Sequence, residues 1–195
     1  MFDACNYFSH YLSVVQGVSK HVNIPMMERI LARVISTIDQ EKTIYLFGNG
    51  GSMATASHLA CDLNYVAGTK MLNKKIKAMA LDSLPTLMAI GNDEGFEWVF
   101  EKQLESLLNP GDLVIAFSGS GNSDNVLDAI RYAKKTKAFT IGITGFSGGM
   151  LFDRADLALV VPIHDMQIVE DFHMIFSHML MRSIVEYYSQ QKEEK

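Results

Sequence analysis

Apolar residues recur at two spacings along this chain, and each spacing predicts one kind of element. Over residues 2–20 and 26–39 they follow the period of an amphipathic helix. Further on, short continuous apolar runs alternate with helical stretches, as in α/β proteins with a buried parallel sheet. The runs predict strands at 43–47, 76–81, 113–117, 138–143 and 157–161. The stretches between them predict helices at about 53–65, 84–91, 95–108, 124–137 and 166–190.

This order of elements predicts the fold class. Strands that alternate with helices form a parallel sheet with helices on both faces. We therefore expect an α/β protein, a three-layer sandwich with a central parallel sheet flanked by helices and a helical N-terminal extension. A length of 195 residues suits one domain, and no linker or repeat divides it. We expect residues 1–195 to form that domain, with the helices of residues 1–40 packing in an oligomer.

Two loops rich in glycine and serine follow the first and third predicted strands. They read Gly48-Asn49-Gly50-Gly51-Ser52 and Ser118-Gly119-Ser120-Gly121-Asn122-Ser123. In a parallel sheet both lie at the carboxyl edge, where ligands bind. Glycines let backbone N–H groups approach a ligand, a helix N-terminus favours an anion, and serine hydroxyls can complete a cradle. The plain alternative is a pair of tight turns with serine N-caps, but two equivalent loops favour a bound phosphate.

The spacing within the loops argues against other ligands and reactions. Gly48 and Gly50 fit a dinucleotide fingerprint, but Met53 stands where its third glycine is required. The chain has no G-x-x-x-x-G-K-[ST] motif for nucleoside triphosphates, and the second loop lacks the frame of a hydrolase nucleophile. Serines without a neighbouring base indicate ligand binding and not acyl transfer.

Composition and charge narrow the class of protein. A net charge of −5, with no long basic stripe, argues against a nucleic-acid partner. No run approaches the roughly 18 apolar residues of a membrane span, and the N-terminal residues lack the basic start of a signal peptide. Cys5 and Cys61 lie in apolar, helix-like surroundings, which suits a reducing compartment. We expect a cytoplasmic protein with no nucleic-acid or membrane partner.

The motifs around the loops resemble a known family. The pair strand–GNGGS–helix and strand–SGSGNS–helix is similar to the sugar isomerase (SIS) domain. The stretches Ser57–Leu63, Ala89–Asp93 and Val169–His173, with His178, resemble phosphoheptose isomerases. Those enzymes convert sedoheptulose 7-phosphate to D-glycero-D-manno-heptose 7-phosphate. The resemblance spans roughly residues 2–190 and implies the SIS fold, an aldose–ketose isomerase and a phosphorylated sugar as substrate.

The resemblance also implies roles for individual residues. Isomerisation moves a proton between adjacent carbons, so it needs a base for the carbon-bound proton and an acid near the carbonyl oxygen. The family's acid–base pair falls on Asp62 and His178. Its metal ligands, with zinc as the ion, fall on His58, Asp62, Glu170 and His178. Its substrate contacts fall on Asn49, Gly50, Gly51, Ser52, Asn92, Asp93, Ser118, Gly119, Ser120, Ser123 and Glu170.

The residues themselves support part of this assignment. His58 and Asp62 are four apart on a helix that starts at the first loop, so they share a face. Histidine and carboxylate are both suitable zinc ligands. A solvated helix face is the alternative for this pair. For His178 the alternative is a buried histidine, because its neighbours are Met174, Phe176, Met179 and Leu180.

Three positions depart from the family's pattern. Asp62 stands where the best-known phosphoheptose isomerases have glutamate, which sets a carboxylate back by about 1.5 Å. Glu170 replaces glutamine and adds negative charge, and Gly119 stands where threonine is frequent. These changes leave phosphosugar binding intact. Two alternatives therefore remain. The substrate is another phosphosugar, or the chain is a non-catalytic SIS protein that binds a sugar phosphate or a protein partner in a regulatory role.

The spacing of site residues on the last predicted helix indicates that subunits share a site. Glu170 and His178 are eight residues apart, about 12 Å along a helix, so one site using both is easier to build with a second subunit. The family is typically tetrameric, with sites at subunit interfaces. The first helix has a broad apolar stripe, formed by Phe2, Tyr7, Phe8, Tyr11, Leu12 and Val15. We expect a homotetramer with shared sites, the alternative being a monomer whose N-terminal helices pack on its own sheet.

Overall fold

A five-stranded sheet forms the centre of the protein, for which a computed structural model describes residues 2–193. All neighbouring strands are parallel and lie in the order β2-β1-β3-β4-β5. Their bounds are Thr43–Gly48 for β1, Lys77–Ala80 for β2, Leu113–Ser118 for β3, Phe139–Gly145 for β4 and Leu157–Val161 for β5. Each strand predicted from an apolar run is confirmed to within two residues at either end.

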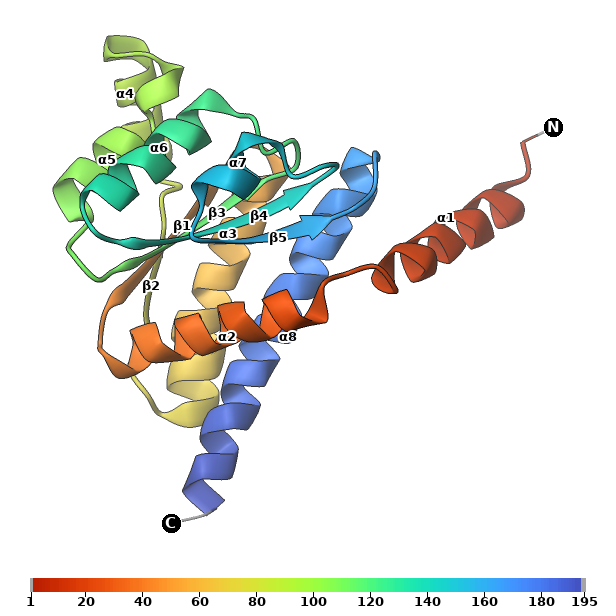
Figure 1. Ribbon diagram of the computed structural model, residues 1–195, viewed down its shortest axis with the longest axis horizontal. Coiled ribbons are helices and arrows are strands. Elements are labelled where there is room, and N and C mark those ends of the chain that lie inside the picture. The colour runs from red at the N-terminus through yellow and green to blue at the C-terminus, as the bar shows by residue number, and fades with distance from the viewer. Residues whose placement is uncertain (1, 194–195) are drawn as a thin grey trace.

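Helices cover both faces of this sheet, so the three-layer prediction is confirmed (Figure 1). One face carries α2 (Ile24–Asp39), α3 (Gly51–Cys61) and α8 (Met166–Glu193), and the other carries α5 (Glu101–Leu107), α6 (Asp124–Lys135) and α7 (Gly149–Arg154). Within β1, Ile44 and Leu46 enter the first core and Tyr45 and Phe47 the second. Because both faces are covered, the strands are mostly apolar and do not alternate between apolar and polar residues.

The helix behind the first loop is longer than predicted. α3 continues without a break into a π-helix, η1 (Asp62–Leu72), whereas the sequence pattern predicted an end near residue 65. A π-helix has wider turns than an α-helix, so its apolar residues do not keep the 3.6-residue period. Asp62 is the first residue of η1, at the point where the helix widens.

Smaller differences concern the segments between strands. The helical stretch after β2 is α4 (Leu84–Asp93), followed by a short 3₁₀ turn, η2 (Phe96–Trp98), and then α5. The sequence pattern predicted one helix over 95–108, whereas in the structure a turn at residues 99–100 separates η2 from α5. The six-residue helix α7 was not predicted, because it is too short to display a period.

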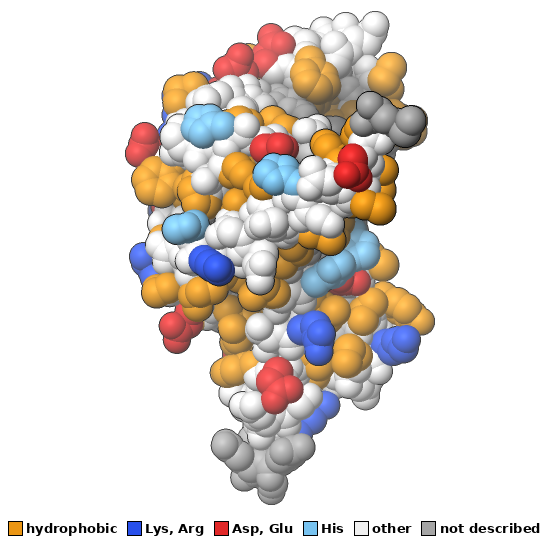
Figure 2. Space-filling model, turned by 90° about the vertical axis from the view of Figure 1, so that its right-hand side faces the viewer, with side chains coloured by type: hydrophobic (Ala, Val, Ile, Leu, Met, Phe, Trp, Pro, Cys, Tyr) orange, Lys and Arg blue, Asp and Glu red, His pale blue; other side chains and the backbone are white. Residues whose placement is uncertain are grey.

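The two N-terminal helices are placed differently. α2 packs on the sheet and buries Ile30, Val34 and Ile38. α1 (Ala4–Ser19) projects from the body, and only its later part packs, around Val18, against α8 (Figure 1). Exposed apolar side chains are spread over the side from which α1 projects (Figure 2). On α1 and just before it they are Phe2, Tyr7, Phe8 and Leu12.

Two expectations from composition can be compared with the structure. Among residues 2–193, none of the helices is both long and apolar enough to cross a membrane. Cys5, on α1, and Cys61, the last residue of α3, are free thiols, and both are exposed.

Candidate active site

The two glycine–serine loops meet at the carboxyl edge of the sheet. β1 and β3 are paired, with Gly48 opposite Phe117, so the loops that follow them lie side by side. Together with the start of α8 they enclose a pocket of about 120 Å³, which we call the cradle. It is lined by Asn49, Ser52, Phe117, Ser118, Gly119, Ser120, Ser123, Met166 and Glu170. All of these except Phe117 and Met166 were predicted as substrate contacts from the sequence.

The helices behind the cradle begin without side-chain caps. α3 begins after Gly50, whose φ of 53° suits glycine, and α6 begins after Ser123. Gly50 has no side chain to cap α3, and the Ser123 side chain makes no capping hydrogen bond to α6. The Ser123 Oγ lies 3.5 Å from the Ser118 Oγ instead. Two neighbouring helix N-termini therefore keep first-turn N–H groups that no side chain caps, which favours a bound anion. This argues against the alternative of turns with serine N-caps.

A reciprocal pair of asparagines joins the two loops. The Asn49 Nδ2 donates to the Asn125 Oδ1 at 3.0 Å, and the Asn125 Nδ2 donates to the Asn49 Oδ1 at 2.9 Å. Asn125 is buried in the first turn of α6. Because each amide satisfies a donor and an acceptor of the other, the pair fixes the spacing of the loops. Asn125 was not predicted from the sequence, although asparagine, a weak helix former, in a first helical turn just after a glycine–serine loop was an available signal.

Gly119 and Met166 together shape one wall of the cradle. A side-chain carbon added to Gly119 would overlap the Sδ of Met166. A threonine, frequent at this position in the family, therefore does not fit here unless Met166 moves. Met166 was missed because nothing in the apolar pattern of α8 shows which loop its first residue reaches.

Glu170 reaches the cradle from α8, one turn after Met166. A Cβ added to Gly51 would lie 2.5 Å from the Glu170 Oε2 and 2.7 Å from its Oε1. Gly51 is the first residue of α3, so the carboxylate lies against the N-terminus of that helix. None of the ion pairs among the described residues involves Glu170. The cradle thus contains a negative charge that no cationic side chain neutralises.

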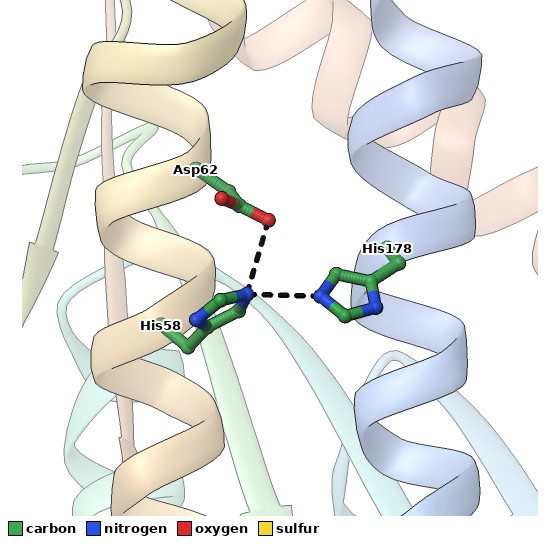
Figure 3. Close-up of side chains that lie close together, drawn as sticks. All are labelled: His58, Asp62 and His178. Carbon is green, nitrogen blue, oxygen red and sulfur yellow. Dashed lines mark hydrogen bonds and ion pairs between the residues drawn. The ribbon is translucent and has the colours of Figure 1, made fainter.

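About two turns further along α3 and α8, three predicted site residues come together (Figure 3). The His58 Nε2 lies 2.9 Å from the His178 Nε2 and 3.4 Å from the Asp62 Oδ2. One ligand atom from each residue lies within 4.8 Å of the other two. The shared face of His58 and Asp62 is confirmed. His178 is exposed, so the alternative of a buried histidine at this position is wrong.

The chemistry of this His58–Asp62–His178 group suits a zinc ion. Two imidazole nitrogens and one carboxylate oxygen resemble the three protein ligands of catalytic zinc sites, which keep a fourth position open. Glu170, the fourth predicted ligand, is not part of the group, because its carboxylate lies against Gly51. The carboxylate of Asp62 is the most shielded member, since this residue is only 7% exposed.

Two other predicted contacts lie outside the cradle of their own chain. Asn92 and Asp93 end α4, and both are exposed. The Asn92 Nδ2 donates to the Asp93 Oδ1 at 2.9 Å. Neither residue lines the cradle.

The buried histidine of α8 is His173. It is fully buried, and neither ring nitrogen has a hydrogen-bond partner among the described residues. Its ring packs against that of Phe117, which lines the cradle, with 5.8 Å between the centroids. Burial lowers the pKa of His173 from 6.5 to about 4, against an opposing contribution from the Thr144 backbone. His173 is therefore neutral at pH 7 and supports the wall of the cradle from behind.

Comparison with known proteins agrees with this geometry. The SIS domain family matches residues 6–145. A phosphoheptose isomerase of Campylobacter concisus is 38% identical over 86% of this chain and 89% of the relative, and one of Nitratiruptor sp. is 42% identical over 78% and 81%. A solved phosphoheptose isomerase from Francisella tularensis has a TM-score of 0.88 and 25% identity, covering 95% of this chain and 100% of that one.

The matches extend well beyond the loop motifs. The relatives align over most of both chains, and the Francisella tularensis structure shares the whole arrangement of sheet and helices. The resemblance found in the sequence motifs is therefore confirmed: the chain belongs to the phosphoheptose isomerase family of SIS-domain proteins.

Proposed function

We propose that this chain converts sedoheptulose 7-phosphate to D-glycero-D-manno-heptose 7-phosphate. The observation that carries this proposal is the succession of two subsites along the same pair of helices. The cradle lies at the start of α3 and α8, and the His58–Asp62–His178 group lies about two turns further along both. The first suits a phosphate, and the second suits acid–base chemistry. The names of the relatives, phosphoheptose isomerases, support the same reaction.

The separation of the subsites supports a sugar of this length. Ser52 and His58 are six residues apart on α3, which corresponds to about 9 Å along the helix. In an extended seven-carbon sugar, the terminal phosphorus lies about 8 Å from the carbonyl carbon, because each carbon–carbon bond is about 1.5 Å. A phosphate in the cradle therefore brings the carbonyl to His58. A three-carbon sugar phosphate does not reach that far.

Asp62 and His178 form the acid–base pair in this proposal. The proton and the oxygen that react are on adjacent carbons, and the short distances within the group match that requirement. Asp62 takes the proton from carbon 1 while the electron pair of that bond forms the carbon–carbon double bond. His178 gives a proton to the carbonyl oxygen, which completes the enediol. Asp62 then returns its proton to carbon 2, and His178 takes the hydroxyl proton of carbon 1 as the aldehyde forms.

His58 orients the pair, because its Nε2 contacts both the Asp62 carboxylate and the His178 ring. We propose that zinc would be held by one ring nitrogen of His58, one ring nitrogen of His178 and one carboxylate oxygen of Asp62. The other oxygen of Asp62 and the other ring nitrogen of His178 would then carry the protons. When bound there, the ion would polarise the carbonyl of the sugar. Glu170 remains in the cradle in this assignment.

We also propose a homotetramer with shared sites, in which residues 1–195 form one domain and the helices of residues 1–40 pack between subunits. α4 has no buried residue: its Leu87 and Ile90 pack against the second core, but Leu84 is 66% exposed, so one side of this helix is left uncovered by the described residues of its own chain. The exposed apolar residues of α1 likewise suit an interface. Asn92 and Asp93 would then contact a sugar held in the cradle of a neighbouring subunit. Light scattering at micromolar concentration is expected to give four times the mass of one chain, and a single-chain mass contradicts the assembly.

A cytoplasmic location is consistent with this assignment. Cys5 and Cys61 are free and exposed, which suits a reducing compartment.

The reaction is tested by incubating the purified protein with sedoheptulose 7-phosphate and following the aldose by NMR, with added zinc and after treatment with a chelator. We expect conversion with zinc and a loss of rate after chelation. Fructose 6-phosphate, one carbon shorter, is the matched control and is expected to react poorly. A non-catalytic SIS protein would bind the sugar phosphate and leave it unconverted, which would favour the regulatory alternative.

A further inference from the structure

The cradle combines two helix N-termini with a negative charge and no basic side chain. Its lining contains no lysine or arginine, and its one ionisable side chain is the carboxylate of Glu170. A phosphate held here would be bound by neutral donors, namely backbone N–H groups, hydroxyls and the Asn49 amide, with a like charge beside it. The attraction of two helix N-termini is thus opposed inside the same pocket.

The position of this carboxylate depends on a glycine. Any side chain on Gly51 would collide with the carboxylate, since even a Cβ would lie 2.5 Å from the Glu170 Oε2. Gly51 therefore allows Glu170 to lie directly against the first residue of α3. An anion at a helix N-terminus is stabilised by the helix dipole. Without ligand, Glu170 thus occupies part of the region that would attract a phosphate.

A carboxylate acts differently on the two halves of a sugar phosphate. It repels the phosphate oxygens, and the repulsion is strong because the pocket is partly shielded from water. It also accepts short, strong hydrogen bonds from hydroxyl groups. Inorganic phosphate experiences mainly the repulsion, whereas a sugar phosphate can offset it with hydroxyls next to the phosphate.

We infer that Glu170 is a specificity-determining residue that makes the cradle prefer phosphates attached to a hydroxylated chain over free phosphate, an inference that rests on the proposed function of the cradle. With this preference, abundant inorganic phosphate in the cell would not block the site. The amide of glutamine, which the family has at this position, lacks the charge that produces this selection.

The test compares Glu170→Gln with the wild-type protein by isothermal titration calorimetry. One probe is inorganic phosphate, and the other is sorbitol 6-phosphate, which has the hydroxylated chain but no carbonyl to isomerise. Glu28→Gln, an exposed position on α2 outside the cradle, removes the same charge and is the matched control. Thermal unfolding of each protein verifies that it is folded.

We expect Glu170→Gln to bind inorganic phosphate about tenfold more tightly, because one nearby like charge is removed. Its affinity for sorbitol 6-phosphate should change less than twofold, and Glu28→Gln should match the wild type with both probes. If Glu170→Gln bound inorganic phosphate with the wild-type affinity, the inference would be overturned, but the assignment of the cradle as a phosphate site would stand. If Glu170→Gln bound both probes more tightly by the same factor, the proposed selectivity of Glu170 would be overturned. If no variant bound either probe, the cradle itself, and with it the proposed function, would be wrong.

Discussion

Removing the buried imidazole of α8 should change how stability depends on pH. His173 titrates near pH 4 in the folded protein because burial disfavours its charged form, and near 6.5 when unfolded. Between these values the unfolded chain binds more protons, so stability is fully present above pH 6.5 and falls as the pH drops toward 4. From pH 7.5 to pH 5 the two pKa values give a loss of about 2 kcal/mol from this one residue.

The variant His173→Leu isolates this contribution. Urea unfolding, followed by circular dichroism at a fixed protein concentration, gives the free energy of unfolding at pH 7.5 and pH 5. The wild type should lose about 2 kcal/mol more than His173→Leu over this range, because all other titrating groups are common to both. His10→Gln, which removes an exposed histidine on α1, should keep the wild-type pH dependence.

At pH 7.5 the substitution should cost little, because leucine removes two ring nitrogens that have no hydrogen-bond partner among the described residues. If His173→Leu and the wild type lost the same free energy between pH 7.5 and pH 5, His173 would not be held neutral by burial, and the reasoning would be refuted.

Three further predictions concern the proposed site. Ser120→Asp should abolish sugar-phosphate binding by charge repulsion, and an unchanged dissociation constant by calorimetry would remove the cradle assignment. Asn125→Leu leaves the Asn49 amide without its partner, so we expect the free energy of unfolding in urea to fall by about 1–3 kcal/mol and the KM to rise. An unchanged free energy of unfolding together with an unchanged KM would contradict the role of the pair. Asp62→Asn and His178→Ala should each lower kcat about 100-fold or more with little change in KM, and wild-type turnover in both would exclude them as acid and base.

The sheet and the cradle were predictable because their causes are local in the sequence. A strand buried on both faces is apolar at every position, as in 113–117, and such a run is visible without knowledge of its neighbours. The two glycine–serine loops were recognisable for the same reason, since Gly50 and Ser120 lie within short segments that directly follow those runs. Features of this kind can be predicted without knowing the tertiary structure.

The rest of the site depends on contacts between distant segments. The amide pair of Asn49 and Asn125 and the overlap between Gly119 and Met166 exist only because two loops and α8 meet at one edge of the sheet. The eight-residue spacing between Glu170 and His178 was known, but not that the two side chains lie at separate places along α3, one at Gly51 and one at His58. The π-helix that begins at Asp62 was not predictable from the apolar pattern either, because that pattern is recognised by the α-helical period.

Isomerisation of sedoheptulose 7-phosphate in deuterium oxide tests the central claim most directly. NMR reports both the amount of aldose formed and the isotope at its carbon 2. His58 and His178 are exposed, so protons held by the acid–base group should exchange with solvent. We predict that the aldose accumulates and carries deuterium at carbon 2, and that Asp62→Asn forms almost none. Sedoheptulose 7-phosphate that is bound but stays unchanged, or an aldose formed as fast by Asp62→Asn as by the wild type, would contradict proton transfer by this group.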